Sequence, residues 1–309
     1  MADHPLADVL ENVKAPVRVG VSGRPGAGRD TVRRALRGVG AAVVDSGESA
    51  EIEVYVFCET LTREDIARLC GARRPVVAVL NKADLTCFRG DGPMAVAAQR
   101  CRDWERRTGV PTRPLAALLA VAASPGGLDQ SLIDALGTVT VEPMRLQPAI
   151  GRRLLAELDL YGIAVAATAV SDGADAVMLA GVLRSVSGIT AVLDEIERVS
   201  APIRYRSLVG ALTGLAEHPV GPRGARAAQF LASDAVVLAR MAAAIEVVAV
   251  SERAGGDSDE CAAQLRRAIY WQHYARGPVS ALHRACGSDI ARGALRLWLR
   301  AGGCPDSMP

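Results

Sequence analysis

The sequence predicts an α/β fold in its first part and an all-helical C-terminal domain after it. Between residues 17 and 140 short apolar runs alternate with amphipathic helical patterns. Strands separated by helices in this way are typical of a mostly parallel sheet with flanking helices. Beyond Pro143 apolar residues recur only at helical spacing, in windows closed by Gly or Pro. We therefore expect two domains, residues 1–140 and 141–309, with Glu142 and Pro143 as the linker.

The first domain is expected to begin with a strand, a glycine turn and a helix. Val17 to Val21 is a compact β-branched run, and the glycines behind it lead to a helix over residues 29–37. Thr62 followed by Asp65 indicates an N-cap at the start of a later helix. In the second domain the longest helical segment, 225–253, is rich in alanine, whose small side chain allows close helix packing. Further strands are expected at 41–44, 54–57, 76–80 and 115–122, and further helices at 62–70, 94–108 and 128–136.

The composition excludes several classes of protein. With 309 residues, 50% of them hydrophobic, and a net charge of +2, the chain is expected to be folded and soluble. It has no polybasic region for binding nucleic acid or anionic lipid. The seven cysteines form no CxxC pair and are interpreted as reduced thiols of a cytoplasmic protein. Charged residues interrupt the apolar stretches, so neither a signal peptide nor an integral membrane span is expected.

The glycine-rich segment 23–31 stands where the first strand should pass into the first helix. Glycines at such a turn let backbone N–H groups point at an anion, and the helix N-terminus adds partial positive charge. The segment resembles the P-loop of Era-like and dynamin-like GTPases, GxxxxGK followed by Ser or Thr, with Arg29 at the lysine position and Asp30 at the magnesium-binding hydroxyl position. A glycine turn without a ligand is the alternative interpretation. The resemblance implies phosphate binding by Gly23, Gly26, Gly28, Arg29 and Thr31.

Asn81, Lys82 and Asp84 directly follow the apolar run 75–80 and resemble the NKxD guanine-specificity motif of the same GTPases. The resemblance implies that the Asp84 carboxylate accepts hydrogen bonds from the N1–H and the exocyclic amine of guanine. It also implies that Asn81 ties this loop to the glycine-rich loop and that Lys82 packs its stem over the base. The chain has only two asparagines and two lysines, so the use of one of each here favours a guanine site over coincidence.

Residues 121–129 resemble the loop after the last strand of Era-like domains, where a Ser-Ala pair presents a backbone N–H to guanine O6. Val121 stands at the serine position. The resemblance implies that the backbone of Ala122 makes the contact with the base. Taken without the other motifs, the segment is an ordinary strand-to-helix loop.

Several parts that GTP hydrolysis requires are altered or missing. Too few residues separate Thr31 from Asp45 for a switch loop with a magnesium-binding threonine. A DxxG motif is missing too, because Gly47 follows Asp45 one residue too early. Asp30 and Asp45 are the two candidate ligands of Mg²⁺. Hydrolysis is expected to be weak or absent, and no catalytic residue is assigned.

These motifs lead to one function hypothesis and one alternative. The first is a guanine-nucleotide-binding regulatory protein that takes GTP or GDP, with Mg²⁺, and couples through its helical domain to a protein partner, for which another GTPase is a candidate. The alternative is a nucleotide-free pseudo-GTPase, a scaffold that partners an active GTPase. An ATP-dependent P-loop kinase is disfavoured by the NKAD sequence at 81–84 and by the missing lysine in the glycine-rich segment.

Overall fold

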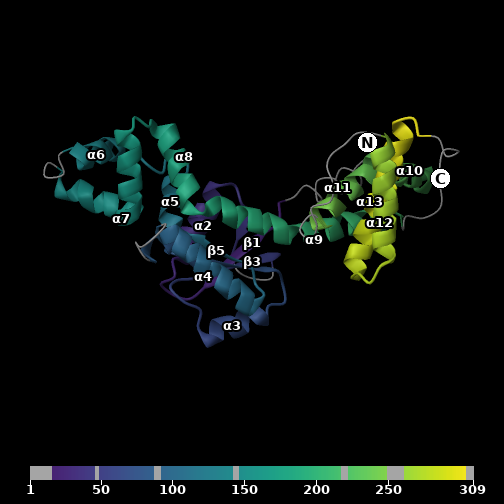
Figure 1. Ribbon diagram of the computed structural model, residues 1–309, viewed down its shortest axis with the longest axis horizontal. Coiled ribbons are helices and arrows are strands. Elements are labelled where there is room, and N and C mark those ends of the chain that lie inside the picture. The colour runs from purple at the N-terminus through teal and green to yellow at the C-terminus, as the bar shows by residue number, and fades with distance from the viewer. Residues whose placement is uncertain are drawn as a thin grey trace. The chain divides into compact units, whose positions relative to one another are not determined.

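The computed structural model describes residues 16–45, 49–86, 92–141, 146–216, 222–248 and 261–303 (Figure 1). Within these ranges the chain forms two compact units, one up to residue 199 and one from residue 200 onward. The expected linker at Glu142 and Pro143 lies outside the described residues, and so does Gly47, which the sequence places one residue too close to Asp45 for a DxxG motif.

A five-stranded, all-parallel sheet forms the centre of the first unit and confirms the predicted α/β class. The strand order β2-β1-β3-β4-β5 is a doubly wound order, in which the winding direction reverses between β1 and β3. Ligands of such sheets bind outside the carboxyl ends of the strands at this switch point. The strands are β1 (Val19–Gly23), β2 (Val43–Val44), β3 (Ile52–Phe57), β4 (Val76–Asn81) and β5 (Thr112–Leu115).

Helices cover both faces of the sheet, which is why β4 is apolar as far as Leu80 and β3 is apolar except for Glu53, with no alternation of apolar and polar residues. On one face Tyr55, Phe57 and Leu80 pack against α3 (Arg63–Cys70) and α4 (Pro93–Thr108). On the other side α2 (Arg29–Gly38) packs against β1 and α5 (Ala117–Ala122). The expected N-cap of α3 is confirmed as a full capping box, with the Thr62 and Asp65 side chains each bonded to the other's backbone N–H.

The expected strand at 115–122 is wrong. Strand β5 is Thr112–Leu115, and residues 117–122 form helix α5. The helical segment is rich in leucine and alanine, which are strong helix formers. Pro114 is tolerated in the strand because β5 lies at the edge of the sheet. The Ala116 N–H donates to the Ser187 carbonyl, and a Cβ on Gly188 would lie 2.5 Å from the Pro114 carbonyl oxygen, so the corner at 187–188 covers the outer side of β5.

The first unit extends beyond the boundary at residue 140 that the sequence indicates. Helices α6 (Gln130–Val141), α7 (Pro148–Ser171) and α8 (Ala176–Ser187) share one core with α5. This core includes Leu119, Leu136, Leu158 and Leu183, each with 0% exposed surface. Because these apolar faces are buried against α5, the helices that follow residue 146 fold with the sheet, up to Val199.

All the regular elements among the described residues of the second unit are helices, as predicted. This unit contains the rest of α9 (Ile189–Ala216) and the helices α10 (Pro222–Leu231), α11 (Asp234–Val248), α12 (Cys261–Arg276) and α13 (Ala281–Arg300). Trp271, Tyr205 and Ile290 lie in its core. The alanine-rich segment is two helices, because residues 232 and 233 form a break between α10 and α11; residues 249–253 of that segment lie outside the described ranges.

Among the described residues α7 alone is long and apolar enough to cross a membrane, and the bent pair of α8 and α9 would make a second span. A core helix of a soluble protein passes the same test of length and composition. Leu154, Leu158 and Ala166 of α7 are buried in the core shared with α5. The five described cysteines are free thiols.

Candidate functional site

The glycine-rich loop begins where β1 ends and leads directly into α2. Gly23 has φ 139°, and a Cβ there would lie 2.0 Å from the Val56 carbonyl oxygen of β3, so only glycine fits. Gly28 precedes the first turn of α2 with φ 84°, and its carbonyl accepts from the Val32 N–H at 3.0 Å. The loop is therefore held between β3 and the N-terminus of α2, at the carboxyl edge of the sheet.

Asn81 joins the glycine-rich loop to the start of α5. Its Nδ2 donates to the Ala27 carbonyl at 2.9 Å, and its Oδ1 accepts from the Ala117 N–H at 3.2 Å. Asn81 is 3% exposed and is the last residue of β4, directly opposite Leu115 of β5. The first of these bonds is the tie between the two loops that the resemblance implies. The second links both loops to the segment that follows the last strand.

The Asp84 carboxylate is at the same edge of the sheet but is buried, with 4% exposed surface. Burial raises the pKa of Asp84, the nearby carboxylate of Asp159 raises it further, and Lys82 opposes the shift. Burial and Asp84 together also raise the pKa of Tyr161. Helix α7 departs from helical geometry at Asp159, with φ 57° and ψ 177°, so its bend lies beside Asp84. Lys82 is exposed and has a left-handed backbone with φ 58°.

The Asp30 side chain is exposed and forms an ion pair instead of facing a metal site. It is 92% exposed and pairs with Arg33 one turn further along α2, at 2.5 Å. Arg33 also donates to the Val21 carbonyl at 2.9 Å. Asp45 is exposed at the end of β2. Among the described residues no group of three or more His, Cys, Asp and Glu side chains could hold a metal ion.

Arg24 is a residue of this edge to which the sequence assigned no role. Its Nη2 donates to the Thr60 carbonyl at 2.6 Å, and its Nε lies 3.4 Å from Oδ2 of the buried Asp65. Asp65 also accepts from the Tyr55 hydroxyl and the Thr62 N–H. Burial opposes ionisation of Asp65, but these bonds and Arg24 keep its pKa below the usual value. The guanidinium thus fastens the glycine-rich loop to the loop after β3, at the switch point.

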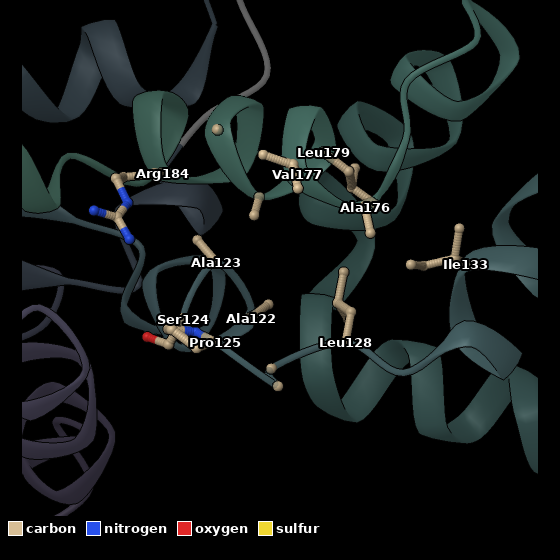
Figure 2. Close-up of a pocket in the computed structure, with 14 residues that line it drawn as sticks. Ala122, Ala123, Ser124, Pro125, Leu128, Ile133, Ala176, Val177, Leu179 and Arg184 are labelled. Carbon is tan, nitrogen blue, oxygen red and sulfur yellow. The ribbon is translucent and has the colours of Figure 1, made fainter.

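Ala122 is not at the carboxyl edge. It is the last residue of α5 and lines a hollow of about 440 Å³ under α8 (Figure 2). A Cβ on Gly38, the last residue of α2, would lie 2.2 Å from Oγ of Ser124 in the same segment. Because ten helical residues span about 15 Å, this segment lies near the opposite end of α2 from the glycine-rich loop. The residues that directly follow the last strand are Ala116 and Ala117.

The hollow beside Ala122 is mainly apolar. Figure 2 shows Leu128 and Ile133 directed into it from below and from the side, and Val177 of α8 above them. Among the described residues that line it, Arg184 alone is charged. The hollow lies near the C-terminal end of α2 and is therefore separate from the edge of the sheet where Asn81 and the glycine-rich loop meet.

Comparisons with protein-family models, with curated proteins and with solved structures find no match to this chain. The geometry of the described residues is therefore the basis for a function. That geometry gathers the glycine-rich loop, Asn81, Asp84 and the start of α5 at the carboxyl edge of one parallel sheet. It leaves Ala122 out of this group, and the side chain of Asp30, although its backbone belongs to the glycine-rich segment, is exposed and paired with Arg33.

Proposed function

We propose that this protein is a guanine-nucleotide-binding regulatory protein whose own hydrolysis of GTP is weak or absent. The observation that carries the proposal is the Asn81 side chain, which bonds to Ala27 of the glycine-rich loop and to Ala117 after the last strand. A base held by Asp84 and phosphates held by the loop would then belong to one ligand. Sheets of this winding order bind ligands at the same edge.

The phosphate end of the proposed site consists of backbone groups and Arg29. The N-terminus of α2 and the left-handed glycines suit an anion. Arg29 brings a positive charge, although its planar group does not reproduce a compact ammonium. Asp30 pairs with Arg33, so Mg²⁺ has no firm protein ligand in the first turn of α2. GTP or GDP would therefore bind with little help from Mg²⁺, and phosphoryl transfer would lack its usual electrostatic support.

The base end of the proposed site requires a movement of α7. Guanine needs an ionised carboxylate that faces two N–H donors, whereas Asp84 is buried beside Asp159 and Tyr161. Binding of the base would separate the bend at Asp159 from Asp84 and relieve the repulsion between the two carboxylates. Nucleotide binding would thereby change the position of α7, which gives the protein a means of signalling its state to a partner.

A nucleotide-free pseudo-GTPase scaffold is the second candidate function. The burial of Asp84 favours it, because a closed base site needs no ligand to be stable. In either case we propose a cytoplasmic protein whose helices bind a protein partner, for which an active GTPase is one candidate. Helices α7 and α8 expose large apolar side chains that suit such contacts: Leu155, Leu160, Val177 and Met178.

Isothermal titration of the full chain with GTP and GDP, with and without Mg²⁺, separates the two candidates. Saturable heat with guanine nucleotide and none with ATP supports the first, and no heat with either supports the scaffold. Asp84→Asn should then weaken GTP binding at least about tenfold and favour the xanthine nucleotide, because the amide offers a donor where the acceptor stood. Asp134→Asn, at an exposed position of α6, is the matched control. Equal binding of ATP and GTP by the wild type would refute guanine selectivity.

A further inference from the structure

A small pocket in the second unit collects three arginines around one buried carboxylate. The pocket has a volume of about 230 Å³ and lies between the turn after α10, one face of α11 and one face of α13. The carboxylate, Asp289, is 3% exposed. All the lining residues belong to the second unit, so a ligand bound here would be independent of the proposed nucleotide site. The wall consists of Leu231, Ala232, Val237, Arg240, Asp289, Arg292 and Arg296.

Helical spacing explains why these charges meet. Asp289, Arg292 and Arg296 are three and then four residues apart on α13, so they lie on one face of the helix. Arg240 reaches the same place from α11. A buried carboxylate is energetically costly unless it is paired with a positive charge. The need to pair Asp289 therefore accounts in part for the arginines around it.

Asp289 forms short hydrogen bonds with only one of the three guanidinium groups, that of Arg240. Its Oδ2 accepts from the Tyr205 hydroxyl at 2.8 Å and from Arg240 Nε at 3.0 Å, and Arg240 Nη2 lies 2.9 Å away. Arg292 Nη1 lies 3.5 Å from the other oxygen. Asp289 and Tyr205 thus hold Arg240 in place, and Arg292 retains most of its hydrogen-bonding capacity.

Arg296 is also held loosely. Its Nη2 donates to the Ala232 carbonyl at 3.3 Å, and its Nη1 lies 3.6 Å from the half-exposed Asp234 at the start of α11. Three guanidinium groups therefore face Asp289 in the wall and Asp234 at the edge, which leaves the pocket with excess positive charge. Guanidinium forks match the oxygens of phosphate and form strong charge-assisted bonds with them.

We propose that this pocket binds a phosphoryl group, either as inorganic phosphate or as the phosphate of a monoester. The volume is below that of pockets for drug-sized molecules, which favours a single tetrahedral anion over a whole nucleotide. Arg292 and Arg296, one turn apart on the same face of α13, offer several N–H donors, and Arg240 reaches the pocket from α11. A planar carboxylate would use fewer of these donors than a tetrahedral anion does.

The test is titration of the full-length protein with inorganic phosphate, O-phosphoserine and acetate at constant ionic strength. Saturable heat is expected with a phosphoryl compound, and the tighter of the two identifies the source as free phosphate or monoester. Arg292→Gln and Arg296→Gln should each weaken binding at least about tenfold. Arg292→Lys, which keeps the charge but loses the fork, should lie between the wild type and Arg292→Gln.

Two controls localise the signal. Arg284→Gln removes an exposed charge from the same helix and should leave phosphate binding unchanged. Arg29→Gln removes the arginine of the glycine-rich loop, so any phosphate signal that this variant loses belongs to the proposed nucleotide site and not to the pocket. The Arg292 side chain is 59% exposed, so its replacement should leave the melting temperature without phosphate unchanged. No saturable heat with either phosphoryl compound would overturn the proposal. So would equal binding of acetate, or loss of binding in Arg29→Gln with retention in Arg292→Gln and Arg296→Gln.

Discussion

Replacement of Asn81 by alanine tests whether one buried amide holds the carboxyl edge of the sheet together. The change removes the donor to the Ala27 carbonyl and the acceptor of the Ala117 N–H, at 2.9 and 3.2 Å. Ala27 and Ala117 are 1% and 2% exposed, so water cannot easily replace the lost partners. An unsatisfied buried group costs about 1–3 kcal/mol, so the two together lower the free energy of unfolding by about 2–6 kcal/mol.

The loss should appear both in the melting temperature and locally in hydrogen exchange. For a unit of this size 1 kcal/mol corresponds to roughly 2–4 °C, so the calorimetric transition of the sheet unit should fall by about 4–24 °C. Backbone amides at 24–30 and 112–119 should exchange faster than those of the second unit, because the bridge joins these two segments. A control, Gln99→Ala, removes an exposed amide of α4 and should change stability by less than about 0.5 kcal/mol.

The reasoning would be refuted by an Asn81→Ala protein that loses less than about 1 kcal/mol of stability. It would be refuted equally by faster exchange spread evenly over both units. Asn81→Asp sharpens the result, because the carboxylate keeps an acceptor for the Ala117 N–H but places a second acceptor against the Ala27 carbonyl. Asp should therefore be no better tolerated than alanine, even though its shape is the same as that of asparagine.

Three further predictions concern charge. The raised pKa of Asp84 means that the folded protein favours the protonated carboxyl. The contribution of Asp84 to the free energy of unfolding is therefore complete below pH 3.8 and is lost as the pH rises through the raised pKa. In urea unfolding, Asp84→Asn should be more stable than the wild type at neutral pH and equal to it below pH 3.8. Burial first, and then the bond to Asp65, raise the pKa of Tyr55 from 10.0 to about 12. The free energy of unfolding should therefore fall between these two pH values, and it should fall less in Tyr55→Phe; parallel curves of stability against pH for the two proteins would contradict this. The double variant Arg29→Lys with Asp30→Ser should improve GTP binding in calorimetry more than phosphate release, whereas brisk Mg²⁺-dependent hydrolysis by the wild type would contradict the assignment.

The sequence could predict the elements whose signals are local. The strand before the glycine-rich loop, the N-cap at Thr62 and the helical second part all follow from patterns within a few residues. Strand β5 could not be found in the same way, because Pro114 argues against a strand unless its edge position is known. The expected position of Ala122, directly after the last strand, is wrong for the same reason, because that strand ends seven residues earlier, at Leu115.

The state of the candidate site could not be predicted, because distant segments determine it. The motif predicts Asp84 as a recognition residue, but burial first, and then the nearby Asp159 of α7, raise its pKa. Asp30 stands at a metal position in the sequence, but Arg33 pairs with it. The tie between Asn81 and the glycine-rich loop was predictable from the resemblance, and the bond to Ala117 was not, because it depends on how β5 and α5 meet.

The covered outer side of β5 has a consequence for how copies of this chain could associate. Unpaired N–H and C=O groups along an edge strand are a template for adding a strand from another molecule. At one edge of the sheet Pro114 has no N–H group, and the Ala116 N–H already donates to the Ser187 carbonyl. At the other edge β2 is only two residues long. Among the residues that the structure describes, neither edge offers a run of free groups long enough for strand addition. Assembly into larger species should therefore use helical surfaces, and the native sheet should not seed cross-β fibres.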